Sequence, residues 1–213
     1  MIYEAVNTTI LKHVPLSASQ ILDVGCGTGG LGRALKQLLR CEVTGITFSA
    51  EEARLAGSAL DRVVVVDLDE FVPPKDFGRF DVVICSHVLE HLRRPKELLQ
   101  ALKRCLRPDG RLIVSLPNSL HWRARTAFLI GNFKYTEGGV MDTTHLRFYD
   151  RDTCRELVAQ SGFTVREWYA DGNVPLPFAR RVMPRLLSNA LDRLGLASFP
   201  GLFAFQFVVI ADV

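Results

Sequence analysis

The sequence contains no long run of apolar residues and no organised set of cysteines. No stretch approaches the roughly 20 apolar residues that a membrane-spanning helix needs. The N-terminal residues include Glu4 and no apolar segment, so we expect no signal peptide. The five cysteines are scattered and form no Cys-x-x-Cys pair, which argues against a disulfide framework and against a zinc site. We therefore expect a soluble cytoplasmic protein with reduced thiols.

The sequence also lacks a strong charge bias, an internal repeat and a low-complexity segment. Its net charge of +3 excludes neither nucleic acid nor anionic small molecules as ligands, and it favours neither. The 213 residues are 48% hydrophobic, which is enough to build one good core. We therefore expect a single domain over residues 1–213.

A glycine-rich turn is the feature that organises the N-terminal half. Residues 21–32 read ILDVGCGTGGLG: an apolar run ends in an acid, and glycines then open onto leucines at helical spacing. This pattern predicts a strand, a tight turn and a helix. The turn lacks the Lys-Ser/Thr pair of phosphate-binding loops, and the Asp23 carboxylate would repel a pyrophosphate. It suits a cationic nucleoside without phosphates, such as S-adenosylmethionine.

Strand and helix patterns then alternate along the chain. Apolar segments predict strands at 42–47, 63–66, 80–85 and 111–116. The segment 63–66 is apolar throughout, so we expect it to be buried on both faces. Ser49 and Glu52 form a capping-box pattern, and residues 86–107 predict a helix with a break near Pro95. The alternation predicts an α/β fold with a doubly wound sheet that binds ligands at the carboxyl ends of its strands.

The ends of the chain are less regular. Residues 2–14 have the spacing of an amphipathic helix that caps the sheet, and a role of Tyr3 at the ligand stays open. Residues 117–149 lose periodicity, and we interpret them as a lid. A helix through Gln160 and strands at 163–169 and 202–211 follow. Residues 175–200 predict a helical insertion with four arginines, whose charged face is either solvated or contacts a membrane surface or a partner.

Together these patterns resemble the class I S-adenosylmethionine-dependent methyltransferases. The shared motifs are Asp-x-Gly-x-Gly, an acid after the third strand, Phe-Asp-Val-Val-Ile, Leu-Glu-His at 89–91 and Leu-Arg-Pro-Asp-Gly at 106–110. The run from Pro117 to Phe148 is similar to members found among bacterial cell-surface polysaccharide genes, or to the methionine-biosynthesis W protein. The resemblance implies a Rossmann-like seven-stranded sheet of order 3-2-1-4-5-7-6 with its last strand antiparallel.

The resemblance also implies which residues hold S-adenosylmethionine. The methionine end would lie on the glycine turn, with the Asp23 carboxylate holding the ammonium; the turn residues are Asp23, Gly25, Cys26, Gly27 and Gly29. Asp67 and Leu68 would meet the adenine, and Ser86 and His87 would flank the methionine moiety and the sulfonium. Thr47, followed by Phe48, stands where most relatives have an acid for both ribose hydroxyls. Since a hydroxyl is a single-point partner, this departure predicts weaker ribose recognition.

Candidate catalytic residues follow the fourth strand. His87, Glu90 and His91 would share one helical face if the helix starts by Ser86. Three interpretations stay open. The Glu90–His91 pair packs near the cofactor without catalysing; or His91 is a general base, as the resemblance to phosphoethanolamine methyltransferases implies; or the three residues and the remote His145 hold a divalent metal. We expect His91 and His145 to be catalytic, without a metal.

We expect the acceptor side in the lid. Its aromatic and basic side chains suit an anionic acceptor, and the candidates are Asn118, His121, Trp122, Arg123, Tyr135 and Arg147. Alternatively, Trp122 and Phe133 only close a small core over the sheet. Nucleic acid is not expected, because the basic residues are dispersed and the Asn/Asp-Pro-Pro-Tyr/Phe motif of base methyltransferases is missing after the fourth strand.

These observations predict a methyltransferase that transfers a methyl group, by in-line displacement, to an oxygen or nitrogen of a small metabolite such as a sugar or glycoconjugate precursor. The product from the cofactor would be S-adenosylhomocysteine. The alternative hypothesis is a cofactor-binding partner that regulates another biosynthetic enzyme, as the methionine-biosynthesis W resemblance permits. The sequence leaves open whether the protein is a monomer or a homodimer.

Overall fold

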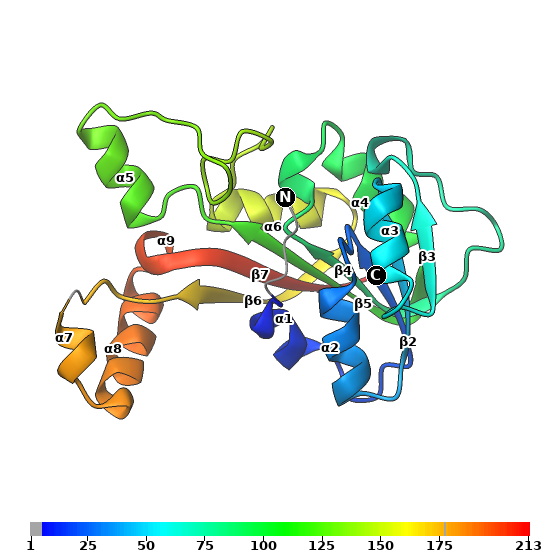
Figure 1. Cartoon of the computed structure of the whole chain (residues 1–213), viewed down its shortest axis with the longest axis horizontal. Helices are drawn as coiled ribbons and strands as arrows, with labels where there is room; N and C mark the ends of the chain where they lie inside the picture. Colours follow the sequence, from blue (N-terminus) through cyan, green and yellow to red (C-terminus); the bar gives the residue numbers. More distant parts are fainter. Residues whose placement is uncertain (1–5, 177) are drawn as a thin grey trace.

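The fold is a mixed sheet with helices on both of its faces. The computed structural model describes residues 6–176 and 178–213. Seven strands lie in the order β3-β2-β1-β4-β5-β7-β6 (Figure 1). The strands are β1 (Gln20–Val24), β2 (Glu42–Thr47), β3 (Arg62–Val65), β4 (Phe80–Ser86), β5 (Leu106–Pro117), β6 (Thr164–Gly172) and β7 (Ala204–Asp212). The pairs among β1 to β5 are parallel, whereas β7 runs antiparallel to β5 and β6. The predicted sheet order and antiparallel last strand are confirmed.

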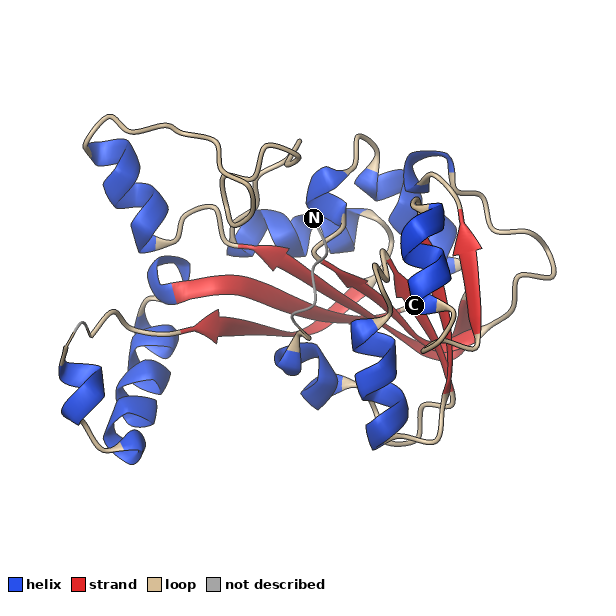
Figure 2. Cartoon of the chain, in the orientation of Figure 1, coloured by secondary structure: helices blue, strands red, loops and turns tan. Residues whose placement is uncertain are grey.

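Two groups of helices bury the two faces of the sheet (Figure 2). One apolar cluster takes residues from α1 (Thr8–His13), α2 (Gly30–Leu38) and α3 (Ala50–Ala56). The other takes residues from α4 (Pro95–Lys103), α6 (Arg151–Gln160) and the short 3-10 turns η1 (Leu68–Glu70) and η2 (Leu89–His91). The central strands are therefore buried on both faces, as is usual for parallel strands in a doubly wound sheet.

A further set of helices projects from one end of the sheet. Figure 1 shows α5 (Trp122–Leu129), α7 (Ala179–Val182), α8 (Arg185–Ser198) and α9 (Pro200–Phe203) beyond the end of β5 and β6 and the start of β7. Within residues 6–176 and 178–213, no helix has both the length and the apolar character needed to cross a membrane.

The structure corrects two of the expected elements. Strand β3 lies at the edge of the sheet, and half of the Val65 side chain is exposed, so this strand is not buried on both faces. The expected helix from Ser86 does not form, because β4 continues through Ser86 and His87 has a φ of +50°. The chain then makes η2, and α4 begins only at Pro95. Tyr3 lies outside the described residues.

Asp81, from the Phe-Asp-Val-Val-Ile motif, ties the start of β1 to β4. Its carboxylate accepts hydrogen bonds from the backbone N–H groups of Ser19 (2.8 Å) and Gln20 (2.9 Å), and it forms an ion pair with Arg107. Burial acts to raise the pKa of Asp81, but these donors outweigh it and lower the pKa to about 2. The motif acid therefore anchors the strand that leads into the glycine turn.

Candidate active site

The glycine turn is held against β2 in a conformation that requires glycine. The backbone N–H groups of Gly25 and Cys26 both donate to the carbonyl of Ile46, at 2.8 and 2.9 Å. Gly25 has a φ of +76°, and a Cβ at that position would come 2.7 Å from a methyl group of Val88. Gly27 has a φ of +51°, and a Cβ there would meet no atom within 4 Å. The turn therefore presents bare backbone to an open space.

Asp23 is a buried carboxyl group at the carboxyl end of β1. Its side chain is 2% exposed, and Oδ2 has no hydrogen-bond partner among the described residues. Burial raises the pKa of Asp23 to about 7. An isolated buried carboxylate is unstable unless a cation or donor pairs with it. The residues of the turn therefore fit a ligand that carries an ammonium, as S-adenosylmethionine does.

The end of β2 carries a carboxylate that sequence analysis assigned elsewhere. Thr47 is buried, and its hydroxyl donates to Oε2 of Glu52 at 2.6 Å. Ser49 Oγ accepts from the backbone N–H of Glu52 at 3.2 Å, so the capping interaction is confirmed, but the Glu52 carboxylate turns toward Thr47. An acid thus lies at the end of β2, although it is five residues later in the sequence than Thr47.

The remaining cofactor candidates lie at neighbouring strand ends. Phe48 is largely exposed after β2. Asp67 follows β3 and caps η1, where its Oδ1 accepts from Asp69 N at 2.9 Å, and Leu68 is buried beside it. Ser86 and His87 end β4. The structure therefore places all the predicted cofactor residues at the carboxyl ends of β3, β2, β1 and β4, which are adjacent in the sheet.

His87 is held as a hydrogen-bond donor. Gln206 Nε2 donates to Asp171 at 2.6 Å, which turns the Gln206 oxygen toward His87 Nε2 at 2.7 Å. That nitrogen therefore carries a proton, and the other ring nitrogen lies 3.4 Å from Glu90 Oε1. Burial alone would lower the pKa of His87, but the hydrogen bond and charge of Glu90 outweigh it and raise the pKa. Both ring nitrogens of His87 therefore face side-chain oxygen atoms that accept hydrogen bonds.

The lid brings the two predicted catalytic histidines together. The rings of His91 and His145 lie edge to face with their centroids 4.8 Å apart, and His145 Nε2 is 4.0 Å from Glu90 Oε1. Glu90 is buried, and the backbone N–H groups of Leu146 and Arg147 donate to its carbonyl at 2.9 and 3.1 Å.

The hydrogen bonds of the lid fix which nitrogen of each histidine is basic. Thr144 Oγ1 donates to Asp142 Oδ1 at 2.6 Å, so it can only accept from His91 Nδ1, which lies 3.0 Å away. His145 Nδ1 lies 3.0 Å from the carbonyl of Val140, which also can only accept. In the neutral form of each ring the lone pair is therefore on Nε2. Sequence analysis missed Thr144, since a threonine in an irregular loop gives no signal by itself.

Asn118 and His121, two of the predicted acceptor residues, have their partners elsewhere in the chain. Asn118 is fully buried, and its amide donates to the carbonyls of Gly201 (3.0 Å) and Ala204 (2.8 Å). His121 is buried too, packs on Phe205 and caps α5 by accepting from Arg123 N at 3.4 Å. Both polar side chains thus hold the base of α5 in place, instead of facing an open site.

The other four acceptor candidates are also spread out. Arg123 stacks over the ring of Trp122 on α5, and Tyr135 lies edge-on against Phe133 further along the lid. Arg147 donates to the carbonyls of Leu92 (3.3 Å) and Arg93 (2.5 Å), so it fastens the end of the lid to η2. A direct contact of Arg123 or Tyr135 with an acceptor stays a prediction.

Comparison with known proteins gives the family. A family model described as "Methyltransferase domain" matches residues 6–167, which is more than half of the chain. The chain belongs to this methyltransferase family. The Leu-Glu-His branch within it stays a prediction.

Relatives and solved structures agree with the methyltransferase fold. The chain is 37% identical over 128 residues to a ubiquinone biosynthesis O-methyltransferase of Xylella fastidiosa, covering 57% of this chain and 49% of that protein. It is 34% identical over 114 residues to the Xanthomonas oryzae protein of that name, covering 51% and 47%. The chain thus spans about half the length of these relatives. A SAM-dependent methyltransferase from Archaeoglobus fulgidus has a TM-score of 0.66 at 19% identity, over 97% of this chain and 92% of that one.

One group of side chains in this methyltransferase has the spacing of a metal site. Among the described residues, Glu90, His91 and His145 each offer one ligand atom, and these atoms lie within 4.8 Å of one another. None of the relatives compared above is named for a metal, and the absence of a metal stays our prediction.

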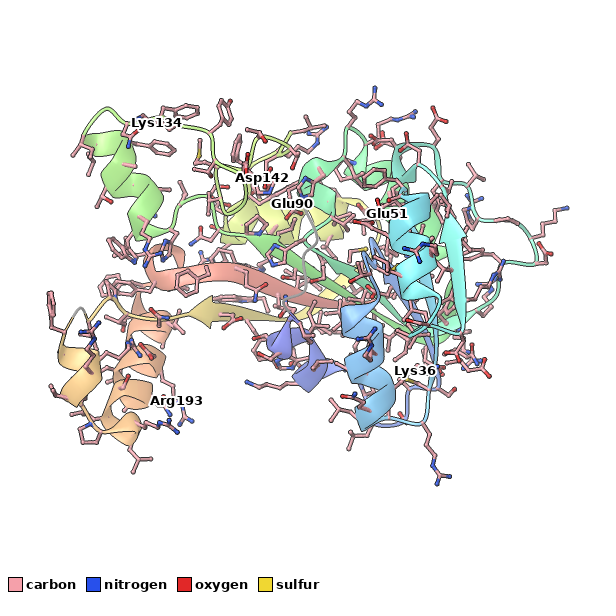
Figure 3. The ribbon with its side chains drawn as sticks, viewed as in Figure 1. Lys36, Glu51, Glu90, Lys134, Asp142 and Arg193 are labelled. Atoms are coloured by element: carbon pink, nitrogen blue, oxygen red, sulfur yellow. The ribbon has the colours of Figure 1, made fainter. Side chains whose placement is uncertain are left out.

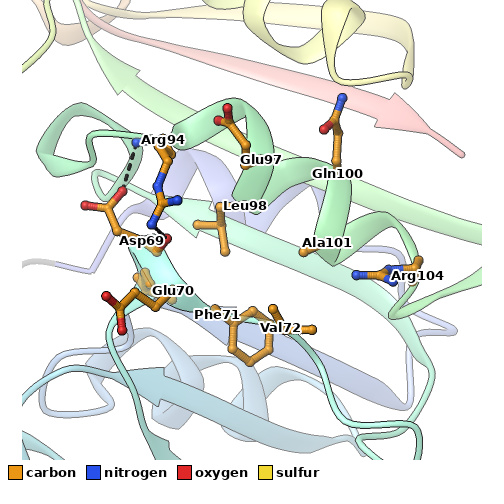
Figure 4. A pocket seen from close by; sticks show the side chains of 11 residues that line it. Asp69, Glu70, Phe71, Val72, Arg94, Glu97, Leu98, Gln100, Ala101 and Arg104 are labelled. Carbon is orange, nitrogen blue, oxygen red and sulfur yellow. Dashed lines mark hydrogen bonds between the residues drawn. The ribbon is translucent and has the colours of Figure 1, made fainter.

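A separate cleft lies beside the cofactor residues of the methyltransferase. It measures about 590 Å³ and lies between η1 and α4, lined by Asp69, Phe71, Arg94 and Leu98 among others (Figure 4). Arg94 N donates to Asp69 Oδ1 at 2.8 Å and closes one end of it. Of the predicted cofactor residues only Leu68 reaches this cleft.

Proposed function

We propose that this chain is an S-adenosylmethionine-dependent O-methyltransferase that acts on a hydroxyl group of a small molecule. The orientation of His91 carries the proposal. A hydroxyl acceptor needs a base during methyl transfer, and the Asp142–Thr144–His91 hydrogen bonds leave Nε2 of His91 as the basic atom. The names of the two relatives, both O-methyltransferases, support oxygen as the acceptor atom. These names give no support for a sugar acceptor, so we define the acceptor by its hydroxyl alone.

The cofactor seat follows from the strand ends. The Asp23 carboxylate would pair with the ammonium of S-adenosylmethionine, which fits its buried, unpartnered Oδ2. Glu52 would accept from the ribose hydroxyls, and this extends our sequence prediction for Thr47. Asp67 and Leu68 would hold the adenine. When bound, S-adenosylmethionine supplies an electrophilic methyl group.

The side chains around Glu90 would handle the proton. The acceptor oxygen forms its bond to the methyl carbon as the sulfur–carbon bond breaks, and the hydroxyl proton passes to His91 Nε2. Thr144 and Asp142 keep Nδ1 of His91 protonated. The buried Glu90 carboxylate stabilises the positive charge that develops on the His91 ring. Because water would compete for these groups, the lid that binds the Glu90 carbonyl serves to exclude it.

We also propose that the protein works in a reducing compartment such as the cytoplasm. All five cysteines are free, and Cys85 and Cys154 are buried. A reducing environment keeps cysteines as free thiols.

The proposal is tested with methyl-labelled S-adenosylmethionine and a panel of phenols, catechols, amines and sugars. We expect transfer to a hydroxyl, and we expect His91→Gln to lower kcat about 100-fold while binding of S-adenosylhomocysteine is retained. His13→Gln is the matched control, because that histidine lies on α1 against Tyr169. Cofactor binding without transfer to any acceptor would contradict the proposal and favour a regulatory partner. If His91→Gln lowered kcat only a few-fold, His91 would not be the base and would have a packing role only.

A further inference from the structure

On helix α8 two polar side chains face the protein, whereas Leu186 and Leu194 face solvent. Ser188 is buried and Asp192 is partly buried, and both bind Arg180: its Nη1 donates to Ser188 Oγ at 2.7 Å, and its guanidinium makes two bonds to Asp192, at 2.9 and 2.7 Å. On the outer side Leu186 is 86% exposed and Leu194 is 65% exposed. Residues eight apart share one helical face. An ordinary surface helix has the reverse arrangement, so α8 presents an unpartnered apolar face.

The orientation of α8 is fixed by these polar contacts. Besides its two bonds to Asp192, Arg180 donates to the carbonyl of Val174 at 2.8 Å. The backbone N–H of Val174 in turn donates to Asp192 at 2.9 Å. The helix therefore cannot roll its leucines inward without breaking a bidentate ion pair and two main-chain bonds. The exposure of Leu186 and Leu194 is therefore fixed by the polar contacts of α8.

Further exposed apolar side chains lie at the same end. Val182 on α7 is 87% exposed, and Leu129 and Ile130 at the end of α5 are 85% and 80% exposed. Figure 1 shows α5 on one side and α7 with α8 on the other, as two projections from one end of the longest axis. We call these residues, with Leu186 and Leu194, the apolar tips.

Unpaired positive charge accompanies the apolar tips. Residues 120–136 contain Arg123, Arg125 and Lys134 and no acidic residue. Residues 176–199 contain one acid, Asp192, which is bound to Arg180, whereas Arg181, Arg185 and Arg193 are exposed and form no ion pair with a described residue. Figure 3 shows Lys134 and Arg193 at this end, one on each projection.

We propose that the apolar tips and the surrounding basic residues dock this end of the molecule on the surface of an anionic lipid bilayer. A helix with leucines on one side and arginines beside them lies in the interface plane, its apolar face at the boundary of headgroups and acyl chains. The basic side chains meet the lipid phosphates. A second copy of the chain is a poorer occupant, because it would bring the same positive charges against each other. The proposal does not depend on which acceptor is methylated.

Vesicle flotation of the full chain tests the proposal. We expect binding to phosphatidylcholine vesicles that contain phosphatidylglycerol, weaker binding at high salt, and little binding to phosphatidylcholine alone. Leu186→Gln with Leu194→Gln should weaken binding roughly ten-fold or more. Arg185→Gln with Arg193→Gln should weaken it by roughly five-fold for each arginine removed.

Matched controls use equally exposed side chains elsewhere on the chain. Leu16→Gln with Leu38→Gln, and Arg33→Gln with Arg40→Gln, should leave vesicle binding unchanged. Equal binding to both kinds of vesicle, no binding, or equal losses in the controls would overturn the proposal. So would a dimer in sedimentation that Leu186→Gln with Leu194→Gln dissolves, since the face would then belong to a second copy. Methyl transfer to a water-soluble acceptor, measured on the same samples, should stay constant, which separates this test from that of the proposed function.

Discussion

Thr47 and Glu52 form a hydrogen-bonded pair at the end of β2. The Thr47 hydroxyl donates to Glu52 Oε2 at 2.6 Å, and Thr47 itself is buried. The hydroxyl therefore orients the carboxylate, while the carboxylate keeps one oxygen for a ligand. We infer that Glu52, in place of Thr47, is the ribose contact.

Removing this carboxylate should weaken the cofactor complex. Hydrogen bonds to a charged group are worth about 2 kcal/mol, so Glu52→Ala should raise the Kd for S-adenosylhomocysteine roughly 30-fold. Glu51→Ala is the matched control, because Glu51 is the neighbouring, exposed residue of α3. Titration calorimetry measures both. If the two variants bind equally well, Glu52 has no contact with the ribose.

The sequence was informative where a residue's role depends on near neighbours. The glycine turn and the cap of α3 follow from local patterns, and the strand order follows from the family resemblance; the structure agrees with all three. Glu52 was misassigned because the capping-box pattern offers its carboxylate a local partner, whereas in the structure that carboxylate accepts from the Thr47 hydroxyl. His87 was placed on a helix because the pattern does not reveal that β4 continues to Ser86.

Long-range burial is what the sequence could not show. Asn118 and His121 lie in a polar, irregular segment and therefore resembled substrate contacts. Their partners are carbonyls at Gly201 and Ala204 and the ring of Phe205, more than 80 positions away. The outward orientation of Leu186 and Leu194 on α8 could not be predicted for the same reason, because it depends on the contacts of Ser188 and Asp192 with Arg180.

Cofactor binding should depend on pH through Asp23. In the ligand-free chain burial raises the pKa of Asp23 to about 7, and pairing with an ammonium would lower it again. Binding then releases a proton below pH 7, so the affinity for S-adenosylhomocysteine should be constant above this pH and fall by up to ten-fold for each unit below it. Asp23→Asn should bind weakly at every pH. Calorimetry in two buffers of different ionisation enthalpy measures the number of protons released on binding. If no proton is released below pH 7, Asp23 does not pair with the ammonium.

Thr144 should act on the rate through His91. Thr144→Val removes the oxygen that accepts from His91 Nδ1, so the ring is free to adopt the other tautomer, and we expect kcat to fall about ten-fold. The KM for S-adenosylmethionine should not change, and Thr144→Ser should restore the rate. Thr143→Val is the control, since the neighbouring Thr143 side chain is exposed. Equal rates in the two valine variants would contradict the role of Thr144.

Chelation separates the general-base hypothesis from the metal hypothesis. If Glu90, His91 and His145 move protons only, prolonged dialysis against EDTA should leave kcat unchanged, and added Mg²⁺ or Zn²⁺ should not raise it. A loss of activity that one of these cations restores would assign the three side chains to a metal ion instead.

Asp81 should control the acid stability of the fold. Its pKa is about 2 in the folded chain and near 3.8 when unfolded, so the carboxylate stabilises the folded state above about pH 4. This stabilisation is lost as the pH falls from about 4 to 2, because the protonated group gives up its bonds to Ser19, Gln20 and Arg107.

Asp81→Asn should lower the free energy of unfolding by about 2 kcal/mol at pH 7 and remove that part of its dependence on acid pH. Asp76→Asn is the control, because Asp76 is an exposed residue between β3 and β4. Urea unfolding between pH 7 and pH 3 measures the difference, and parallel curves for wild type and Asp81→Asn would show that the contacts at the start of β1 do not depend on the carboxylate charge.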